Sequence, residues 1–400
     1  MRPEIAGLMV RLARALHRAG AAAHRIEDDL FAIAERLGVR AEVMVTPTSV
    51  LMALGPPEQQ AVRMIRVQPG EVDLGRLSAV DALSRRIAEG DIGVGEAVRA
   101  LDALDARPPS WGPVAQVVAF GLASSAAAVF FGGHLLDVVL ATLTGLLIGM
   151  AGVLGSASRR ALRILEPAGA FVATFSVAAA GQLGLETSPW VVTASGLIVL
   201  LPGFTLTVAM NELATRNLVA GVARLANAVM TFVLLAFGVA LAVRITALLG
   251  WSMPEVAASA ASPPLLFGAV VVSALSFALI FRVDLDDLLA VAVVSLAGFY
   301  AGRYAADVLG PRLGVFVGAL VIGLAANLWG RRWNHPSSVV AAPAILMLVP
   351  GSIGFRGISE LVTTDVVSGV STAVTTLMVA ASLVAGLLTA NVLIRPRGEL

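Results

Sequence analysis

The spacing of hydrophobic and polar residues changes near residue 110. Before that point, three stretches carry apolar residues at helical spacing and predict amphipathic helices: 5–37 (interrupted at Gly20), 74–89 and 92–105. Between the first two, Val39 to Val45 alternate with polar or outward-facing residues up to a Thr46-Pro47-Thr48 turn, and 50–54 and 61–67 resemble further strands. The first part of the chain therefore predicts a small α/β domain.

Beyond Arg107-Pro108-Pro109-Ser110, which is typical of a linker, the pattern becomes a series of long apolar runs. They lie near residues 112–132, 134–155, 167–185, 189–209, 219–249, 264–282, 286–309, 312–329, 337–355 and 366–394. Each approaches or exceeds the roughly 20 residues that a membrane-spanning helix needs. We therefore expect an α-helical polytopic membrane protein with about ten spans.

The arginines between these runs predict an orientation. The loops expected inside hold Arg159, Arg160, Arg163, Arg216, Arg224, Arg282, Arg331, Arg332, Arg395 and Arg397, and those expected outside at most Arg244, Arg303, Arg312 and Arg356. Because positive loops stay in the cytosol, both termini should be cytosolic. Residues 1–20 carry charges among their apolar residues, unlike a signal peptide, so the α/β domain should be cytosolic. We expect the bacterial inner membrane.

The membrane part contains an internal repeat. Leu200-Leu201-Pro202-Gly203 recurs 148 positions later as Leu348-Val349-Pro350-Gly351, and Glu212 and Gly221 recur as Glu360 and Gly369. Five spans per copy would invert the second copy relative to the first, a plan found in many secondary transporters. The predicted domains are therefore 1–110 (cytosolic α/β domain), 111–250 (first membrane repeat) and 262–400 (second membrane repeat).

The duplicated Pro-Gly pair predicts a broken helix in each repeat, since Pro removes a backbone donor and Gly relaxes the limits on φ. Broken helices at membrane depth point their ends at substrates. The predicted substrate-binding residues are Pro202, Gly203, Phe204, Pro350, Gly351 and Ser352. Replacing either glycine by valine should damage transport more than insertion.

Acidic residues within the apolar part are candidates for proton coupling, because a charge at the bilayer centre is costly and tends to face a cavity or a partner. We select Glu212, Glu360, Asp137 and Asp365. For the first two, the alternative is an interfacial salt bridge to Arg216 or Arg356. Two GxxxG spacings, Gly145–Gly149 and Gly298–Gly302, predict close helix packing between the repeats.

Composition excludes several function classes. The first 110 residues hold 14 of the 28 basic and 15 of the 27 acidic residues, and the net charge is only +1, so we expect no nucleic-acid partner. The chain has no cysteine and its four histidines have no metal-ligand spacing, so we expect no metal and no cofactor. Neither a Walker A nor a hydrolase motif occurs, and we do not expect an enzyme.

Several motifs resemble those of the threonine/serine exporter family. In the first domain these are Gly20–Asp28, Val45–Thr48 and Leu77–Glu96, and in the membrane part Gly132–His134, Leu201–Phe204, Gly221–Leu225 and Pro343–Gly351. The resemblance covers nearly the whole chain. It implies export of threonine and serine, driven by the membrane gradient, by a protein embedded in the lipid bilayer.

Other functions remain open from the sequence. Some two-chain relatives of the family are associated with succinate export, which makes dicarboxylate export an alternative. A membrane-anchored hydrolase acting through His24, Arg25, Glu27, Asp28 and Asp29 is another, although salt bridges to Arg25 or Arg14 are the simpler reading of that cluster. A regulated channel or scaffold is a third alternative, and assembly into a homo-oligomer is also open.

Overall fold

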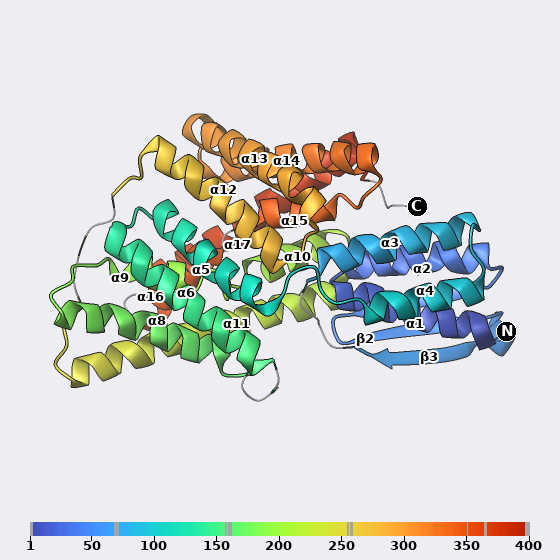
Figure 1. The fold of residues 1–400 in the computed structure, drawn as a ribbon, viewed down its shortest axis with the longest axis horizontal. Coiled ribbons are helices and arrows are strands. Elements are labelled where there is room, and N and C mark those ends of the chain that lie inside the picture. The colour runs from blue at the N-terminus through green and yellow to red at the C-terminus, as the bar shows by residue number, and fades with distance from the viewer. Residues whose placement is uncertain are drawn as a thin grey trace.

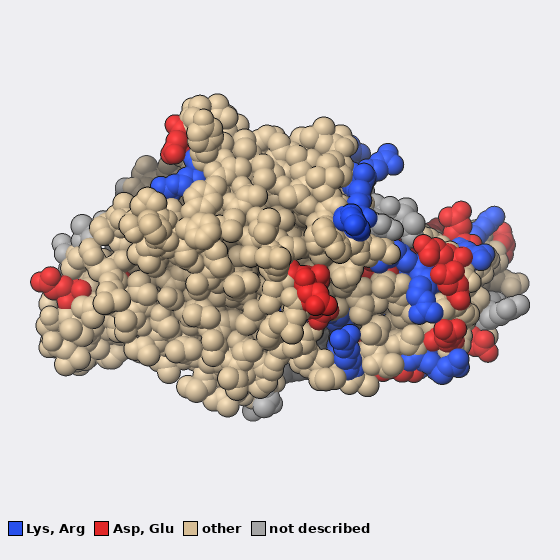
Figure 2. All heavy atoms as spheres, turned by 45° about the horizontal axis from the view of Figure 1, so that its top comes forward, with Lys and Arg blue, Asp and Glu red and all other residues tan. Residues whose placement is uncertain are grey.

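The computed structural model describes residues 3–67, 72–156, 158, 162–253, 256, 259–349, 351–363 and 366–396. An N-terminal α/β region lies at one end of an elongated helical region, and the chain returns to this end at its C-terminus (Figure 1). The two parts differ in surface chemistry. Charged side chains gather over the N-terminal region and are sparse over the helical region (Figure 2).

The N-terminal region is a three-stranded antiparallel sheet with its helices packed on one side (Figure 1). The helices are α1 (Pro3–Ala19), α2 (Ala23–Arg36), α3 (Leu74–Glu89) and α4 (Val94–Ala106); the strands are β1 (Ala41–Thr46), β2 (Ser49–Leu54) and β3 (Ala61–Arg66); η1 (Pro57–Gln59) is a single 3₁₀ turn. In the β1–β2 hairpin, Thr46 pairs with Ser49 across the predicted turn. The small α/β region predicted from the sequence is confirmed.

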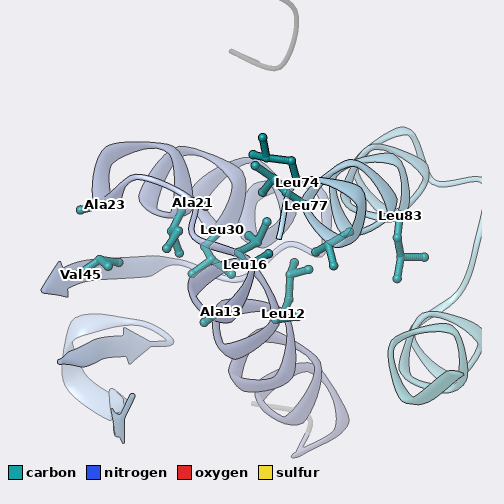
Figure 3. Packing of buried hydrophobic residues seen from close by; sticks show 14 of the residues in the cluster. Leu12, Ala13, Leu16, Ala21, Ala23, Leu30, Val45, Leu74, Leu77 and Leu83 are labelled. Atoms are coloured by element: carbon teal, nitrogen blue, oxygen red, sulfur yellow. The ribbon is translucent and has the colours of Figure 1, made fainter. Parts of the chain in front are cut away.

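Leucines at helical spacing form the core of this region. Leu8, Leu12 and Leu16 of α1 and Leu30 of α2 are fully buried, and α3 adds Leu74 and Leu77 (Figure 3). Burying each such side chain contributes about 1.5–3 kcal/mol. The core therefore holds α1, α2 and α3 as one unit, which gives the turn between α1 and α2 a defined position.

Within the described residues, the helical region has six helices followed by six more in the same order of long and short. The first set is α5 (Pro113–Phe130), α6 (Leu135–Gly155), α8 (Leu165–Gln182), α9 (Pro189–Gly196), α10 (Gly203–Ala214) and α11 (Leu218–Leu248). The second is α12 (Pro263–Ile280), α13 (Leu288–Leu309, after the 3₁₀ turn η2, Leu285–Asp287), α14 (Pro311–Trp333), α15 (Ser338–Ile345), α16 (Gly351–Thr363) and α17 (Val366–Leu393). The sequence repeat is thus also a repeat of helices.

Seven helices in the described part of the chain are long and apolar enough to cross a membrane: α5, α6, α11, α12, α13 with η2, α14 and α17. The other three runs expected as spans differ. One is the 18-residue helix α8. The remaining two, near 189–209 and 337–355, are each divided into two short helices, at the positions where the Pro-Gly pairs predicted a break.

The surface of the helical region is suited to lipid. On α6, Leu135, Leu143, Leu147 and Leu154 are between 49% and 78% exposed. Large exposed apolar surfaces of this kind are unusual on water-soluble proteins. Together with the seven long apolar helices, they indicate a multi-pass membrane protein.

The GxxxG glycines pack within each set of helices, and the expected packing between repeats is wrong. A methyl group on Gly145 would lie 2.3 Å from Oγ of Ser124 on the neighbouring α5. One on Gly298 would lie 2.2 Å from Cγ1 of Ile322 on α14. Small residues bring consecutive helices together here, because α5–α6 and α13–α14 are antiparallel neighbours joined by short connections.

The N-terminal region docks on the helical region through backbone hydrogen bonds. At the start of α3, the Leu74 N–H donates to the Phe281 carbonyl (2.8 Å) and the Gly75 N–H to that of Arg282 (3.1 Å). The indole Nε1–H of Trp111 donates to the Val283 carbonyl (2.7 Å). The segment after α12 thus anchors α3 and the linker, and α2 comes to lie against α10.

Candidate functional site

The two helix breaks meet at their backbones. Gly203 begins α10 and Gly351 begins α16, and both are buried. A methyl group on Gly203 would lie 3.3 Å from the Gly351 Cα, and one on Gly351 would lie 3.4 Å from the Gly203 Cα. Pro202 occupies the position before α10. The corresponding Pro350 lies outside the described residues.

From this contact the two short helices lead to opposite parts of the molecule (Figure 1). Helix α10 ends beside the N-terminal region, where Glu212 contacts Ala23. Helix α16 lies on the far side of the contact, where Phe355 stacks on Trp190 (5.8 Å between ring centroids). Because both helices begin at the contact, the positive ends of their dipoles face one another there.

Each short helix lines a cavity of similar size. The proximal cavity, about 600 Å³, lies between α10, α11 and the N-terminal region. The distal cavity, about 670 Å³, lies between α16, α17 and Trp190. Six pairs of lining residues are separated by 148 positions: Phe204 and Ser352, Thr205 and Ile353, Val208 and Arg356, Val219 and Val367, Ala223 and Ser371, and Arg224 and Thr372. The two cavities are therefore equivalent places in the two sets of helices.

The cavities differ in what covers them. The N-terminal region contributes His17, Thr46 and Pro47 to the proximal cavity. Phe131 and Trp190 take that role in the distal cavity. Each cavity also carries an arginine, but at unrelated repeat positions: Arg224 stands where the second half has Thr372, and Arg356 where the first half has Val208. Either guanidinium is suited to a carboxylate.

Glu212 is fully buried and forms the principal polar contact between α10 and α11. Its carboxylate oxygens accept hydrogen bonds from the Arg224 Nε–H at 3.0 and 3.1 Å, and a longer one (3.4 Å) from the Ala23 N–H at the start of α2. The expected bridge to Arg216 is wrong. Arg216 sits in the turn after α10 with φ 66°, whereas Arg224 lies almost two turns into α11, level with Glu212.

The other acids selected for proton coupling have different surroundings. Asp137 is buried, and its two oxygens accept from the backbone N–H groups of His134 (2.9 Å) and Ser188 (2.7 Å), which joins the start of α6 to the segment before α9. Glu360 lies within α16, but its side chain is outside the described part of the structure. Asp365 is likewise outside it.

The polar cluster on α2 has partners on other elements. Arg25 pairs with Asp81 of α3, in place of the expected partners on its own helix, because α3 packs alongside α2. Glu27 accepts from the Val45 N–H (2.8 Å). Burial raises the pKa of Asp29 to about 7, against the opposing effect of Arg25, and lowers the pKa of His24. Glu27 and Arg25 thus tie α2 to β1 and α3.

Arg224, Arg356 and Trp190 were not predicted from the sequence as lining residues. The repeat offset of 148 does not mark the two arginines, since Arg224 corresponds to Thr372 and Arg356 to Val208. Trp190 carries no such signal either. Its ring receives the Arg356 guanidinium at 5.8 Å, a cation–π contact visible only once the chain is folded.

A charged α/β region joined to a repeated set of membrane-length helices defines a multi-pass membrane protein. Comparison with family models narrows this class to one family. Residues 7–246 match a model described as a threonine/serine exporter, and residues 266–393 match a second model of the same exporter. The chain belongs to the threonine/serine exporter family, and the resemblance noted in the sequence is confirmed.

Curated relatives are fungal membrane proteins. The chain is 24% identical to the pheromone-regulated membrane protein 10 of Saccharomyces cerevisiae over 98% of this chain and 54% of that protein. It is 28% identical to the Candida albicans protein of the same name, over 91% of this chain and 34% of that protein. The chain thus spans about half or less of these relatives. No solved structure matches.

Proposed function

We propose that this protein is a secondary transporter that exports threonine and serine across the inner membrane, driven by the membrane gradient. One observation carries the proposal: α10 and α16 begin at touching glycines and lead into two cavities lined by equivalent residues. Two equivalent cavities separated by a narrow contact suit alternating access, in which the contact is opened from one side at a time.

The proposed membrane architecture follows from the helix repeat. Residues 111–250 and 262–400 each supply three long helices, a helix broken at the Pro-Gly pair and a final long helix. Counting each broken pair as one span gives five spans per repeat, so the second repeat is inverted. With residues 1–110 and both termini in the cytosol, the proximal cavity faces inward. The inner membrane belongs to the proposal, since the relatives named above are fungal.

The proposed substrate site surrounds the contact between the breaks. Its residues are Pro202, Gly203, Phe204, Pro350, Gly351 and Ser352. The positive ends of α10 and α16 favour a carboxylate there, and the arginine in each cavity favours the same group on the way in and out. For proton coupling we retain Glu212 and Glu360 first, and Asp365 after them. Asp137 ranks lower because both of its carboxylate oxygens already accept backbone hydrogen bonds.

Two of the alternative functions left open by the sequence can be compared with these features. A dicarboxylate such as succinate would also suit positive helix ends and one arginine per cavity, so the cavities favour carboxylates in general. The hydrolase alternative has less support, because Arg25 and Glu27 are engaged with α3 and β1. The family description also names an exporter and not an enzyme.

Uptake of labelled threonine into inverted membrane vesicles tests the proposal. With an imposed proton gradient, vesicles containing the protein should accumulate threonine, unlabelled serine should compete, and a protonophore should abolish the accumulation. Vesicles from cells lacking the protein are the control. Accumulation of succinate in place of threonine would move the assignment to dicarboxylates, and accumulation of neither would contradict secondary export.

A further inference from the structure

A third cavity lies where the N-terminal region meets the helical region. This interface cavity, about 240 Å³, is bounded by α2 on one side and by α10, α15 and α17 on the other. Its volume is just below the ~300–1,000 Å³ typical of sites for drug-sized ligands. The space is therefore of the size expected for a small metabolite.

Both signs of charge enter the interface cavity from α2. Arg25 and Asp28 are three residues apart on this helix, so their side chains share one face, and both line the cavity. Paired charges of opposite sign at this spacing are complementary to a zwitterion. An α-amino acid presents a carboxylate to the arginine and an ammonium group to the aspartate.

The guanidinium of Arg25 is held in place but not fully satisfied. Asp81 accepts from Arg25 and also pairs with Arg85 (3.2 Å), so one carboxylate is shared by two positive charges. The Nε–H of Arg25 is buried and has no hydrogen-bond partner among the described residues. Since buried donors are nearly always paired, this group is suited to a ligand oxygen.

The membrane helices add neutral hydrogen-bonding groups. Thr207 and Asn211 of α10 line the interface cavity, as does Asn391 of α17. The Asn327 amide donates to the Asn391 oxygen (2.9 Å), which directs the amide nitrogen of Asn391 elsewhere as a donor. Amides and hydroxyls are suited to the side-chain hydroxyl of threonine or serine.

We propose that the interface cavity binds a small hydroxylated α-amino acid, with Arg25 on its carboxylate, Asp28 on its ammonium group and Asn211 or Asn391 on its hydroxyl. The choice of threonine and serine rests on the proposed function. The cytosolic region thereby acquires a part in substrate loading. Phe204 lines both the interface and the proximal cavities and follows Gly203 directly, so the interface cavity shares a wall residue with the cavity beside the break.

The absence of cysteine from the chain provides a direct binding assay. Ala341 lines the interface cavity, and Ala341→Cys adds little bulk there. In the purified full chain, threonine should slow modification of this cysteine by a soluble thiol reagent. Ala82→Cys, on the exposed face of α3, is the control and should react at the same rate with and without threonine.

Asp28→Asn, introduced beside Ala341→Cys, tests the ammonium contact. It should raise the threonine concentration needed for half-protection about tenfold, the effect of weakening one charge-assisted hydrogen bond. Glu35→Gln, an exposed acid on the same helix, should leave it unchanged. Protection by succinate alone, no protection, or equal protection in the Asp28→Asn protein would overturn the proposal. Each result is independent of vesicle uptake, so loss of the exporter assignment is distinguishable from loss of this site.

Discussion

The Gly203→Val protein should insert into the membrane at near-normal levels and lose export. A Cβ at this position would lie 2.2 Å from Cγ1 of Val349 and 3.3 Å from the Gly351 Cα, so valine forces the two breaks apart. Overpacking of this kind costs about 1–3 kcal/mol, and the cost falls on the contact that has to open and close. We expect the initial rate of threonine export to fall at least about tenfold.

Gly203→Ala and Gly351→Ala are the matched pair. A Cβ at Gly203 would lie 2.2 Å from Cγ1 of Val349, whereas one at Gly351 meets its neighbours at 3.4 Å or more, so the Gly351→Ala protein should retain more export than the Gly203→Ala protein. Combining Gly203→Ala with Val349→Ala removes the clashing methyl group and should recover export relative to Gly203→Ala alone. Normal export by the Gly203→Val protein, with insertion verified by its amount in the membrane, would show that the contact has no part in transport.

Arg224→Met should strongly destabilise the protein. Among the described residues, it leaves the fully buried Glu212 carboxylate with only the long hydrogen bond from the Ala23 N–H. Removing one partner of a buried ion pair costs about 3–5 kcal/mol, and we expect the lower end because that hydrogen bond remains. Thermal unfolding of the purified protein measures the loss, and Arg216→Met, an exposed arginine in the adjacent turn, should change little.

The double variant Glu212→Gln with Arg224→Met separates the pair's contribution to stability from its part in transport. Removing both charges should restore most of the lost stability, because no unpaired charge stays buried. If Glu212 also carries the coupled proton, Glu212→Gln proteins should exchange threonine across the membrane but fail to accumulate it against a gradient. Additive losses in the double variant would mean that the two side chains act independently.

The sequence predicted the elements best where one pattern determined them. The α/β region was predicted from alternating valines around Thr46-Pro47-Thr48 and from leucines at helical spacing. Both helix breaks were predicted from the repeated Pro-Gly pair. Counting continuous spans was less successful, since an apolar run such as 189–209 has the length of one helix even where backbone geometry at Pro202 divides it.

Tertiary contacts were not predictable in the same way. Arg224 lies eight residues beyond Arg216, and only the fold of the α10–α11 turn decides which of them faces Glu212. The partner of Arg25 lies 56 residues away on α3. The docking of the N-terminal region uses backbone carbonyls after α12, which carry no signal in side-chain chemistry. The interface cavity lies between α2 and the helices α10, α15 and α17, which docking brings together, so no inspection of single motifs would have located it.

Side-specific labelling of the two cavities tests the central claim that the contact at Gly203 and Gly351 separates them during transport. Thr205→Cys places a thiol in the proximal cavity, and Ile353→Cys places one at the equivalent position of the distal cavity. A membrane-impermeant thiol reagent is applied to inverted vesicles for the first and to right-side-out vesicles for the second. When threonine and the gradient are supplied, the labelling rates should change in opposite directions, and Gly203→Val should remove both changes. Rates that rise together, as in an open channel, or that do not respond would contradict alternating access.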